Sequence, residues 1–389
     1  MPRKTQGTGL IPLRKIAAII PAAGYSSRMG LYKPLLPIGS SLVIENTIAT
    51  FREAGIEDIR VIIGHKAHLL LPVLDRLGVK AIINDKYHGG MYTSVQQGVR
   101  TLDDATEAFF FLPVDYAAVK PDTVLKLLQN NAEKPCDVIY PVYNGKRGHP
   151  PLITTGFKDA ILSGEPKGGL QTLLTALGKE TRDVAVDDEG ILIDIDTETD
   201  YLNLIRGEMP FFPTREECLA ILQKYQPQEK VLAHILAVTR AAETLSEYLN
   251  SSGMRLHLGV IMAAAMLHDV AKGEKNHAMK GRDIIVSLGY PEIADLIGTH
   301  MELEPESLQE INERTILYLA DKIISGDHFV PLEERLTLRM DKYKEQEVQD
   351  IIRKRIGQAE TIKQNVEQKL GKKLNAILSE LSLTASKAR

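Results

Sequence analysis

The stretch that decides the fold is residues 16–33, IAAIIPAAGYSSRMGLYK, in which an apolar run leads directly into a turn of small residues. The run at 16–20 has the composition of a buried strand. The two glycines of the stretch 16–33, Gly24 and Gly30, are not spaced as in a dinucleotide fingerprint, and no Gly-Lys-Ser/Thr follows as a P-loop requires. The turn instead offers backbone N–H groups at small residues together with two cations, which suits a triphosphate. These candidate contacts are Ala22, Ala23, Gly24, Arg28 and Lys33.

Further along, short β-branched and aromatic runs alternate with amphipathic helical patterns. The strand-like runs are RVIIG (60–64), AII (81–83), AFFFL (108–112) and residues 137–142, and the helical patterns lie near 41–54, 66–77 and 91–102. This alternation is typical of βαβ units, so we expect an α/β domain around a largely parallel sheet that closes near ILIDIDTETDYLNLI.

From about residue 214 the pattern changes to a 3.6-residue period, as in KVLAHILAVTRAAETLSEYL and RTILYLADKIIS, which predicts an all-α domain. The segment 206–214, with two prolines, is the expected linker. We therefore expect domains at 1–208 and 214–340, followed by a charged helical tail at 341–389. The tail has two interpretations, a solvated helix or a contact between copies of the chain in a homo-oligomer.

Length and composition agree with this division. The chain has 389 residues, which at about 150 per domain predicts two to three domains. A net charge of -4 offers no basic field for nucleic acid. Cys136 and Cys218 stand far apart, so no disulfide framework is expected, and the longest apolar run, 260–267, is too short to span a membrane. The N-terminal basic and apolar residues continue into the turn at 22–24, so we expect no export signal and a cytoplasmic protein.

Carboxylates follow two of the expected strands. Asp115 comes just after the run 108–112, at the end of the strand where it would lie beside the first turn. Asp194 and Asp196 alternate along an expected strand and so share one face. Carboxylates at such an edge can hold Mg²⁺ against phosphate oxygens, although each one taken singly is equally compatible with a turn former or a solvated side chain.

These motifs, in this order, resemble the molybdenum cofactor cytidylyltransferase branch of the MobA-like nucleotidyltransferase superfamily over about residues 15–205. The matching motifs are A-A-G-x-S-x-R-M-G-x-x-K at 22–33, L-P-V-D at 112–115, D-I-D-T at 194–197, NDKYHGGMYTSVQQG at 84–98 and RGHPPL at 147–152, followed by SGEPKGGLQTLL. The resemblance implies a Rossmann-like sheet. It also implies nucleotide-binding roles for Ala22, Ala23, Gly24, Ser26, Gly30, Asn84, Gly90 and Ser94.

The reaction implied by the resemblance is attack of an acceptor phosphate, such as that of molybdopterin, on the α-phosphorus of CTP with release of pyrophosphate. Arg28 and Lys33 would neutralise the triphosphate, and Asp115 with Asp194 or Asp196 would hold Mg²⁺. Ala23 favours CTP, because guanylyl-transferring relatives tend to have glycine there. Pro21 and the Tyr-Ala-Ala at 116–118 depart from the family pattern and leave open a sugar, inositol or choline phosphate as the acceptor.

Six of the ten histidines fall within 234–328, several on otherwise apolar helical segments where an unpaired imidazole would be costly to bury. A metal ion would remove that cost, whereas any one histidine taken alone is better explained as a core or surface residue. His257 and His328 keep that ordinary explanation. The ordered set that remains is His234, His268, Asp269, His277, His300 and Asp321.

This order resembles the HD superfamily of metal-dependent phosphohydrolases over about residues 228–335. The resemblance implies a first metal site formed by His234, His268, Asp269 and Asp321, with His277 and His300 as ligands of a second metal and Asp269 as a bridge. Mixed nitrogen and oxygen ligands suit Mn, Fe, Co, Ni or Zn. Such ions would activate water against a phosphoester, and Lys272 is near enough in sequence to contact the phosphate.

We therefore expect a two-activity enzyme that combines nucleotidyl transfer with phosphoester hydrolysis. Its expected partners are a nucleoside triphosphate, with CTP favoured, and a phosphorylated small-molecule acceptor, with no nucleic acid and no membrane. The alternatives are a transferase for another phosphorylated acceptor, a helical domain that binds metal and a ligand as a sensor without turnover, and a scaffold with neither activity.

Overall fold

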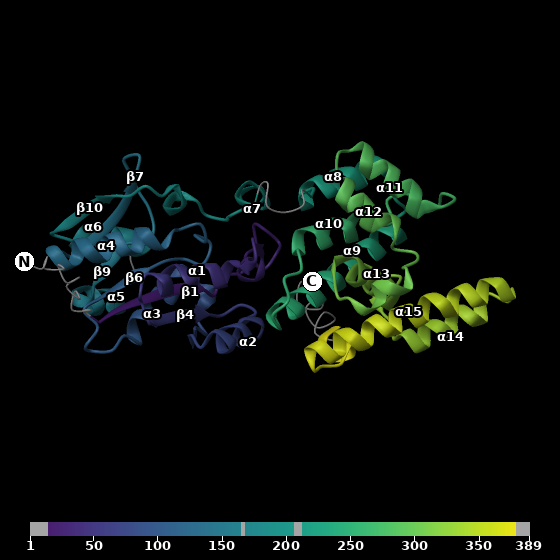
Figure 1. Cartoon of the computed structure of the whole chain (residues 1–389), viewed down its shortest axis with the longest axis horizontal. Helices are drawn as coiled ribbons and strands as arrows, with labels where there is room; N and C mark the ends of the chain where they lie inside the picture. The colour runs from purple at the N-terminus through teal and green to yellow at the C-terminus, as the bar shows by residue number, and fades with distance from the viewer. Residues whose placement is uncertain (1–14, 165–167, 206–211, 379–389) are drawn as a thin grey trace, which may run out of the picture. The chain divides into compact units, whose positions relative to one another are not determined.

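The computed structural model describes residues 15–164, 168–205 and 212–378 (Figure 1). Most of the expected linker, at 206–211, and the N-terminal residues 1–14 lie outside this part. The described residues form two compact units. An α/β unit contains residues up to Ser26 together with Leu42–Asp196, and a helical unit contains Ser27–Ser41 and the residues from Thr197 onward.

An eight-stranded sheet forms the centre of the α/β unit (Figure 1). The strands lie in the order β10 (Thr181–Ala185), β7 (Val138–Tyr143), β9 (Leu152–Thr154), β6 (Ala108–Phe111), β1 (Ile16–Ala22), β4 (Asp58–Ile63) and β5 (Lys80–Ile83), with β8 (Lys146–Arg147) paired to β7. Strands β6, β1, β4 and β5 run parallel, as do β7 and β10. The sheet is nevertheless mixed, because β9 pairs antiparallel with both β6 and β7.

The central strand β1 is apolar on both faces because helices cover both sides of the sheet. Residues 17–20 are fully buried. On one side, a Cβ added to Gly98 of helix α3 (Met91–Arg100) would come within 2.6 Å of Ile19, so this glycine allows close packing of the helix on the strand. The other helices of the unit are α1 (Val43–Glu53), α2 (Ala67–Leu77), α4 (Pro121–Glu133), α5 (Lys158–Ser163) and α6 (Gly169–Leu177). Because β1 pairs parallel with both β4 and β6, the carboxyl ends of these three strands share one edge of the sheet.

The helical unit is built around α10 (Leu258–Leu267), all of whose residues are buried. It packs against α8 (Arg215–Tyr225), α9 (Glu229–Ser251), α12 (Pro291–Gly298) and α13 (Glu313–Ile323). The remaining helices are α7 (Glu198–Leu204), α11 (His277–Ser287), α14 (Leu332–Lys342) and α15 (Gln346–Leu370). Helix α15, from the expected tail, packs against α13 and α14. No helix among the described residues is both long and apolar enough to cross a membrane.

His257 has a structural position at the start of α10. It is 3% exposed, its Nδ1 accepts a hydrogen bond from the backbone N–H of Val260 (3.4 Å), and its ring lies edge-on to Phe212 with centroids 5.1 Å apart. Burial lowers the pKa of His257 to about 4. The imidazole is therefore a neutral helix cap in the folded protein at neutral pH.

This cap makes folding stability depend on pH. Because the folded-state pKa lies below the ordinary 6.5, the unfolded chain binds the extra proton first, and stability falls as pH drops from about 6.5 toward 4. We expect a loss on the order of 3 kcal/mol from this group. His257→Asn keeps a capping side chain without the titration. Urea unfolding of both proteins at pH 7 and pH 4.5 should show a smaller pH difference for the variant, and equal differences would refute this role.

Candidate active sites

The small-residue turn after β1 lies at the carboxyl edge of the sheet. Ala22 and Ala23 are each 3% exposed, and the carbonyl oxygen of Ala23 accepts a hydrogen bond from the backbone N–H of His65, just past β4 (3.1 Å). Gly24 is exposed, and a Cβ built on it would meet nothing within 4 Å. The turn is thus held against the sheet and open at Gly24, as the approach of a phosphate to backbone N–H groups requires.

Three of the predicted carboxylates come together at this edge. The backbone N–H of Ile195 donates to the carbonyl oxygen of Asp115 (3.1 Å), which places Asp194 and Asp196 on either side of that contact. Burial is the main cause that raises the pKa of the Tyr116 phenol to about 12, and the charges of Asp194, Asp115 and Asp196 raise it further in that order. The result is a concentration of negative charge next to the end of β6.

The segment that carries Asp194 and Asp196 is not the strand that its alternation predicted. A short 3-10 helix, η4 (Glu189–Leu192), precedes it, and residues 193–196 belong to no strand of the sheet. The alternation itself remains, since Ile195 is fully buried between two half-buried aspartates. Among the described residues, the only sets of three metal-donor atoms that lie within 4.8 Å of one another are in the helical unit. The carboxylates of Asp115, Asp194 and Asp196 are therefore neighbours that are farther apart than such a set.

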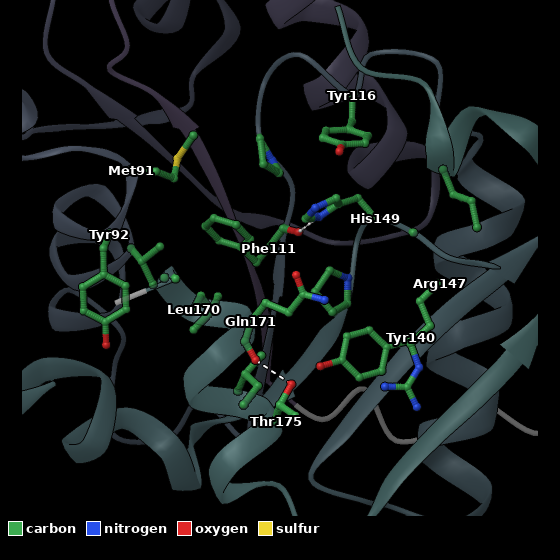
Figure 2. Close-up of a pocket in the computed structure, with 18 of the residues that line it drawn as sticks. Met91, Tyr92, Phe111, Tyr116, Tyr140, Arg147, His149, Leu170, Gln171 and Thr175 are labelled. Carbon is green, nitrogen blue, oxygen red and sulfur yellow. Dashed lines mark hydrogen bonds between the residues drawn. The ribbon is translucent and has the colours of Figure 1, made fainter. Parts of the chain in front are cut away.

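A cavity of about 580 Å³ opens beside Asp115 (Figure 2). Residues of the predicted segment 147–152 form one wall, and Gly168, Gly169 and Gln171 from the segment after Ser163 form another. Gly148 is required there, because an added Cβ would lie 2.3 Å from the carbonyl oxygen of Ile191. The volume is ample for a phosphorylated small molecule.

The polar groups of this cavity are held in fixed positions. The guanidinium of Arg147 lies 4.3 Å from the ring centroid of Tyr140 and donates from Nε to Asp183 (2.7 Å). The rings of His149 and Tyr116 are neighbours in this cavity (Figure 2), and their centroids are 4.4 Å apart. Burial lowers the pKa of His149, so its imidazole is neutral at physiological pH. The cavity therefore presents one cation, several neutral hydrogen-bonding groups and the Asp115 carboxylate to an acceptor.

The predicted nucleotide residues of the segment 84–98 also meet. The side-chain amide of Asn84 donates to the hydroxyls of Ser94 (3.0 Å) and Thr93 (2.9 Å), and Asn84 is 4% exposed. Gly90 precedes α3 with a φ of +92°, a conformation that favours glycine. Asn84 and Ser94 thus form a bonded pair that fixes the start of α3 against the end of β5.

The second half of the loop that follows β1 belongs to the helical unit. Ser26 has a φ of +54°, and residues 27–41 after it belong to that unit. Lys33 is 8% exposed in the 3-10 helix η1 (Lys33–Leu35), whereas Arg28 is exposed. Gly30 faces the guanidinium of Arg215, whose Nε lies 3.1 Å from an ideal Cβ. The two predicted phosphate-binding cations therefore differ strongly in burial.

Asn250 of α9 anchors this loop. Its fully buried side-chain amide donates to the carbonyl oxygens of Leu35 (3.2 Å) and Leu256 (2.8 Å), and its Oδ1 accepts from the Leu256 N–H (2.7 Å). Asn250→Ala would leave these backbone groups unsatisfied, and we expect a loss of about 3 kcal/mol in the free energy of unfolding. Gln129→Ala, at an exposed position on α4, should cost below about 0.5 kcal/mol. Similar losses in urea unfolding would contradict this anchoring role.

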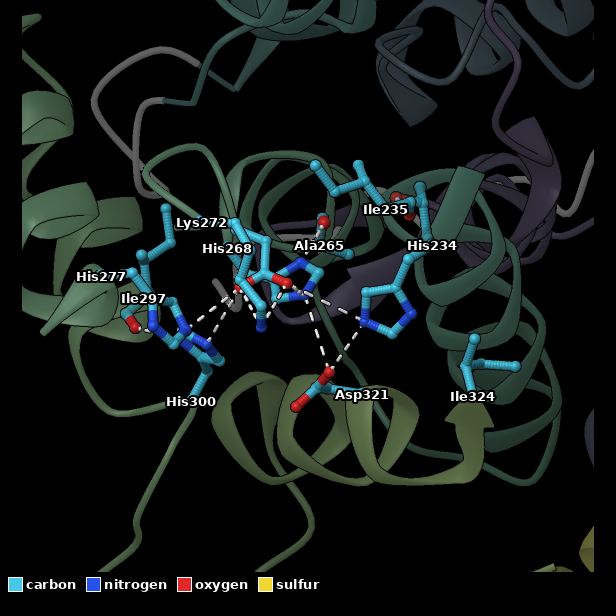
Figure 3. A network of polar contacts seen from close by, with 12 residues as sticks. His234, Ile235, Ala265, His268, Lys272, His277, Ile297, His300, Asp321 and Ile324 are labelled. Atoms are coloured by element: carbon cyan, nitrogen blue, oxygen red, sulfur yellow. Dashed lines mark hydrogen bonds and ion pairs between the residues drawn. The ribbon is translucent and has the colours of Figure 1, made fainter. Parts of the chain in front are cut away.

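The helical unit brings together all six predicted metal ligands (Figure 3). His234 comes from α9, His268 and Asp269 from the end of α10, and His277 from the start of α11. His300 follows α12, and Asp321 lies on α13. The ligand atoms of His234, His268 and Asp269 lie within 4.8 Å of one another, as do those of Asp269, His277 and His300.

Asp269 belongs to both groups through different oxygens. Its Oδ2 lies 3.5 Å from Nε2 of His268 and 4.0 Å from Nε2 of His234. Its Oδ1 lies 3.3 Å from Nε2 of His277 and 3.7 Å from Nε2 of His300. Ligand bonds of about 2.1 Å place neighbouring ligand atoms about 3.0–3.5 Å apart. The contacts to His268 and His277 fall in that range, whereas those to His234 (4.0 Å) and His300 (3.7 Å) are longer, so each of these two would have to move closer to hold an ion together with Asp269.

Two imidazoles present unprotonated nitrogens to the cluster. Nδ1 of His268 and His300 hydrogen-bonds to the carbonyl oxygens of Ala265 (2.8 Å) and Ile297 (2.6 Å), which assigns the proton to Nδ1. In His234 both ring nitrogens face acceptors, the carbonyl oxygen of Gly326 (2.9 Å) and Oδ1 of Asp321 (3.1 Å). The buried Nε2 atoms of His268 and His300 make no hydrogen bond. Burial lowers the pKa of His300 to about 3 and also lowers that of His268. Neutral, unsatisfied nitrogens are costly unless a metal ion binds them, so the donor set fits divalent ions.

Two lysines border the cluster. The Lys272 ammonium lies 2.9 Å from Oδ2 of Asp269. Lys322 is 5% exposed, pairs with Asp321 at 2.5 Å and donates to the carbonyl oxygen of His300. Burial raises the pKa of Asp321, but Lys322 and the three imidazoles of His234, His268 and His300 together outweigh it and hold that pKa well below its usual range. Oδ1 of Asp321 lies 3.1 Å from Nε2 of His234, which makes it a fourth donor on that side.

One further histidine lies outside the cluster, and three arginines that the sequence did not single out lie beside it. His328 is exposed beside Asp327, in keeping with its ordinary explanation. Sequence reasoning missed three arginines, Arg335, Arg339 and Arg355, which line the cavity beside the cluster. The available signal was the spacing of four between Arg335 and Arg339, which places both on one face of a helix.

Comparisons with known proteins match two segments of the chain to described domain families. Residues 18–182 match the MobA-like NTP transferase domain, and residues 231–326 match the HD domain. The chain thus contains a nucleotidyltransferase domain and an HD domain, both from enzyme families. It is 27% identical over 191 residues to the molybdenum cofactor cytidylyltransferase of Escherichia coli K12, an alignment that covers 48% of this chain and 94% of that protein.

Solved structures are similar to the first half of the chain. The protein Rv0371c of Mycobacterium tuberculosis H37Rv is 21% identical, with a TM-score of 0.46, over 50% of this chain and 98% of that one. A nucleotidyl transferase from Methanothermobacter is 25% identical, with a TM-score of 0.43, over 49% of this chain and 95% of that one.

Proposed function

Because the chain combines a nucleotidyltransferase domain with an HD domain, we propose that it is a two-activity enzyme. The first activity is Mg²⁺-dependent transfer of CMP from CTP to a phosphate-bearing acceptor such as molybdopterin. The second is metal-dependent hydrolysis of a phosphoester. The observation that carries the second activity is the sharing of Asp269 between two histidine pairs, and the distant relation to a cytidylyltransferase supports the first.

In the transferase, an oxygen of the acceptor phosphate would attack the α-phosphorus of CTP, and the bond to pyrophosphate would break. Asp115 with Asp194 or Asp196 would hold Mg²⁺, which when bound supplies charge neutralisation to the triphosphate. The turn at Ala22, Ala23 and Gly24 would donate backbone N–H groups to phosphate oxygens. Arg28 and Lys33 would add positive charge, the role that the family motif gives them.

The acceptor would occupy the 580 Å³ cavity beside Asp115. Arg147 would bind an anionic group of the acceptor, and the neutral His149 and Tyr140 would donate or accept hydrogen bonds. Asn84 and Ser94 would fix the wall formed by the start of α3. Transfer of this kind depends mainly on positioning and charge neutralisation, so no nucleophilic side chain is needed.

In the hydrolase, the six donors of the cluster would hold two divalent ions from among Mn, Fe, Co, Ni and Zn. When bound, such ions lower the pKa of water and polarise a phosphoester. The Nδ1 contacts of His234, His268 and His300 keep the imidazoles oriented toward the cluster. Lys272 would exchange its contact with Asp269 for one to the substrate phosphate.

Selective protection against heat tests the choice of nucleotide. A ligand that binds the folded state raises its apparent stability by about 2.7 kcal/mol at a concentration 100 times its Kd. We expect CTP with Mg²⁺ to raise the melting temperature more than ATP, GTP or UTP at equal concentration. Pyrophosphate release with CTP and molybdopterin, compared with sugar, inositol and choline phosphates, then tests the acceptor. Preference for GTP or UTP would refute the cytidylyl assignment.

A hydrolysis screen on the full chain tests the second activity. Phosphomonoesters, phosphodiesters and nucleotides are supplied with Mn²⁺, and phosphate release is measured. Hydrolysis that disappears on chelation supports the assignment. Bound metal without turnover of any compound would favour a ligand sensor instead.

A further inference from the structure

A cavity of about 300 Å³ opens beside the histidine–aspartate cluster, and cations outnumber carboxylates in its lining. Its two carboxylates, Asp269 and Asp321, both belong to the cluster itself. The cations of the lining are Lys230, Lys272, Lys322, Arg335, Arg339 and Arg355. Bound divalent ions would add to this positive charge, so the cavity is built for a strongly anionic occupant.

Half of these cations come from helices beyond the matched HD segment, which ends at residue 326. Arg335 and Arg339 lie one turn apart on α14, and Arg355 lies on α15. Both helices pack on the unit through contacts of α13 with α14 and α15. The charged C-terminal helices therefore form a wall of the cavity and are more than a solvated appendage.

The arginines of this wall form no ion pair with a described carboxylate, although Asp321 acts on Arg335 and Glu302 on Arg355 from a greater distance. Arg335 is 7% exposed and donates to the carbonyl oxygen of Ile324. The Nε of Arg355 is buried and makes no hydrogen bond. Within residues 212–378, neither Arg339 nor Arg355 forms an ion pair, whereas Arg353 on the same helix as Arg355 pairs with Asp350 at 3.0 Å. Six cations with only two carboxylates in the same lining repel one another, and an anion bound between the arginines would reduce that repulsion.

We propose that this cavity binds a substrate with at least two phosphate groups. One phosphate would lie at the cluster, within reach of Lys272, and another would bind Arg339 and Arg355 on the opposite wall. This inference rests on the proposed hydrolase activity and names its substrate class, a compound such as a nucleoside polyphosphate. Arginine suits the second position because its planar guanidinium can bind two phosphate oxygens at once.

The non-phosphate part of the substrate would contact apolar side chains in the same lining. Val231, Ile352 and Ile356 line the cavity together with the arginines. The volume lies at the lower end of that seen for small-molecule sites. A compact group such as one nucleoside, partly open to solvent, is therefore a better fit than a long polymer.

Binding of two non-hydrolysable probes tests this proposal on the full-length, metal-loaded chain after removal of free ions. Methylenediphosphonate carries two phosphonates, and methylphosphonate carries one. By calorimetry we expect methylenediphosphonate to bind at least about tenfold more tightly, which corresponds to about 1.4 kcal/mol. The double variant R339Q/R355Q should lose at least about tenfold in affinity for methylenediphosphonate and under about threefold for methylphosphonate.

R353Q is the matched control, because Arg353 is on the same helix but does not line the cavity, and its affinities should stay within about twofold of the wild type. Any binding of the probes by the α/β unit persists in both variants and serves as an internal reference. Equal affinity for the two probes, or equal behaviour of R339Q/R355Q and R353Q, would overturn the proposal. Absence of phosphoester hydrolysis with the affinity difference intact would instead refute the hydrolase and leave a polyphosphate-binding site.

Discussion

Replacing Asp269 by asparagine should remove metal from both positions of the cluster and reduce phosphoester hydrolysis by on the order of a thousandfold. The reason is that each oxygen of Asp269 faces a different pair of imidazoles: Oδ2 faces His234 and His268, and Oδ1 faces His277 and His300. An asparagine side chain keeps one oxygen and loses the negative charge. Metal content by mass spectrometry and phosphate release measure the two effects.

Asp283→Asn is the matched control for this variant. Asp283 is an exposed carboxylate on α11, the helix that begins with His277. Its replacement should leave metal content and hydrolysis unchanged, and D269N should keep nucleotidyl transfer. Full metal content in D269N would show that the shared carboxylate is not a ligand.

Asp115→Asn should reduce pyrophosphate release by on the order of a thousandfold. Asp115 lies at the carboxyl end of β6, and its backbone carbonyl holds the segment with Asp194 and Asp196 beside it. The variant removes one of three clustered charges, and with it the strongest candidate for holding Mg²⁺ against the triphosphate. Pyrophosphate release with CTP and acceptor at saturating Mg²⁺ measures the loss.

Asp122→Asn, an exposed position in the first turn of α4, should retain transfer. D115N should also keep the metal content and the hydrolysis of the helical unit. Undiminished pyrophosphate release by D115N would refute the transferase assignment. Loss of both activities in either D115N or D269N would point to unfolding, which a thermal melt would reveal.

The order of strands and helices in the α/β unit was largely predictable, because buried parallel strands are apolar runs separated by amphipathic helices. The runs at 16–20, 60–64 and 108–112 each became a strand of the sheet. Strand β9 was missed, since three residues carry little periodicity and its antiparallel pairing with β6 and β7 is set by distant segments. The same limit explains why residues 193–196 were predicted as a strand: alternating exposure does not establish a pairing partner.

The ligands of the cluster came from a resemblance, and their geometry could not have come from the sequence. His234 and Asp321 are 87 residues apart, yet their side chains lie 3.1 Å from each other. The packing of α9, α10 and α13 around a common core decides that distance. The Nδ1 contacts that fix each imidazole are made to backbone carbonyls, which no side-chain motif reveals.

The positions of Lys33 and Arg355 also could not be predicted from the sequence, because the packing of distant segments decides them. Lys33 was expected to neutralise a triphosphate from the loop at 22–33, but it is 8% exposed and its loop is held by Asn250, more than 200 residues away in the chain. Arg355 looked like part of a solvated charged helix, but α15 places it in the lining of a cavity. Charge alone does not distinguish a solvated face from a binding wall until the packing of its helix is known.

The central claim is that Asp269 is shared by two metal positions, and anomalous diffraction from crystals of the full chain grown with Mn²⁺ tests it most directly. We expect two anomalous peaks, one between Oδ2 of Asp269 and the imidazoles of His234 and His268, and the other between Oδ1 and the imidazoles of His277 and His300. A single peak that does not contact Asp269, or no peak in the cluster at saturating Mn²⁺, would contradict it.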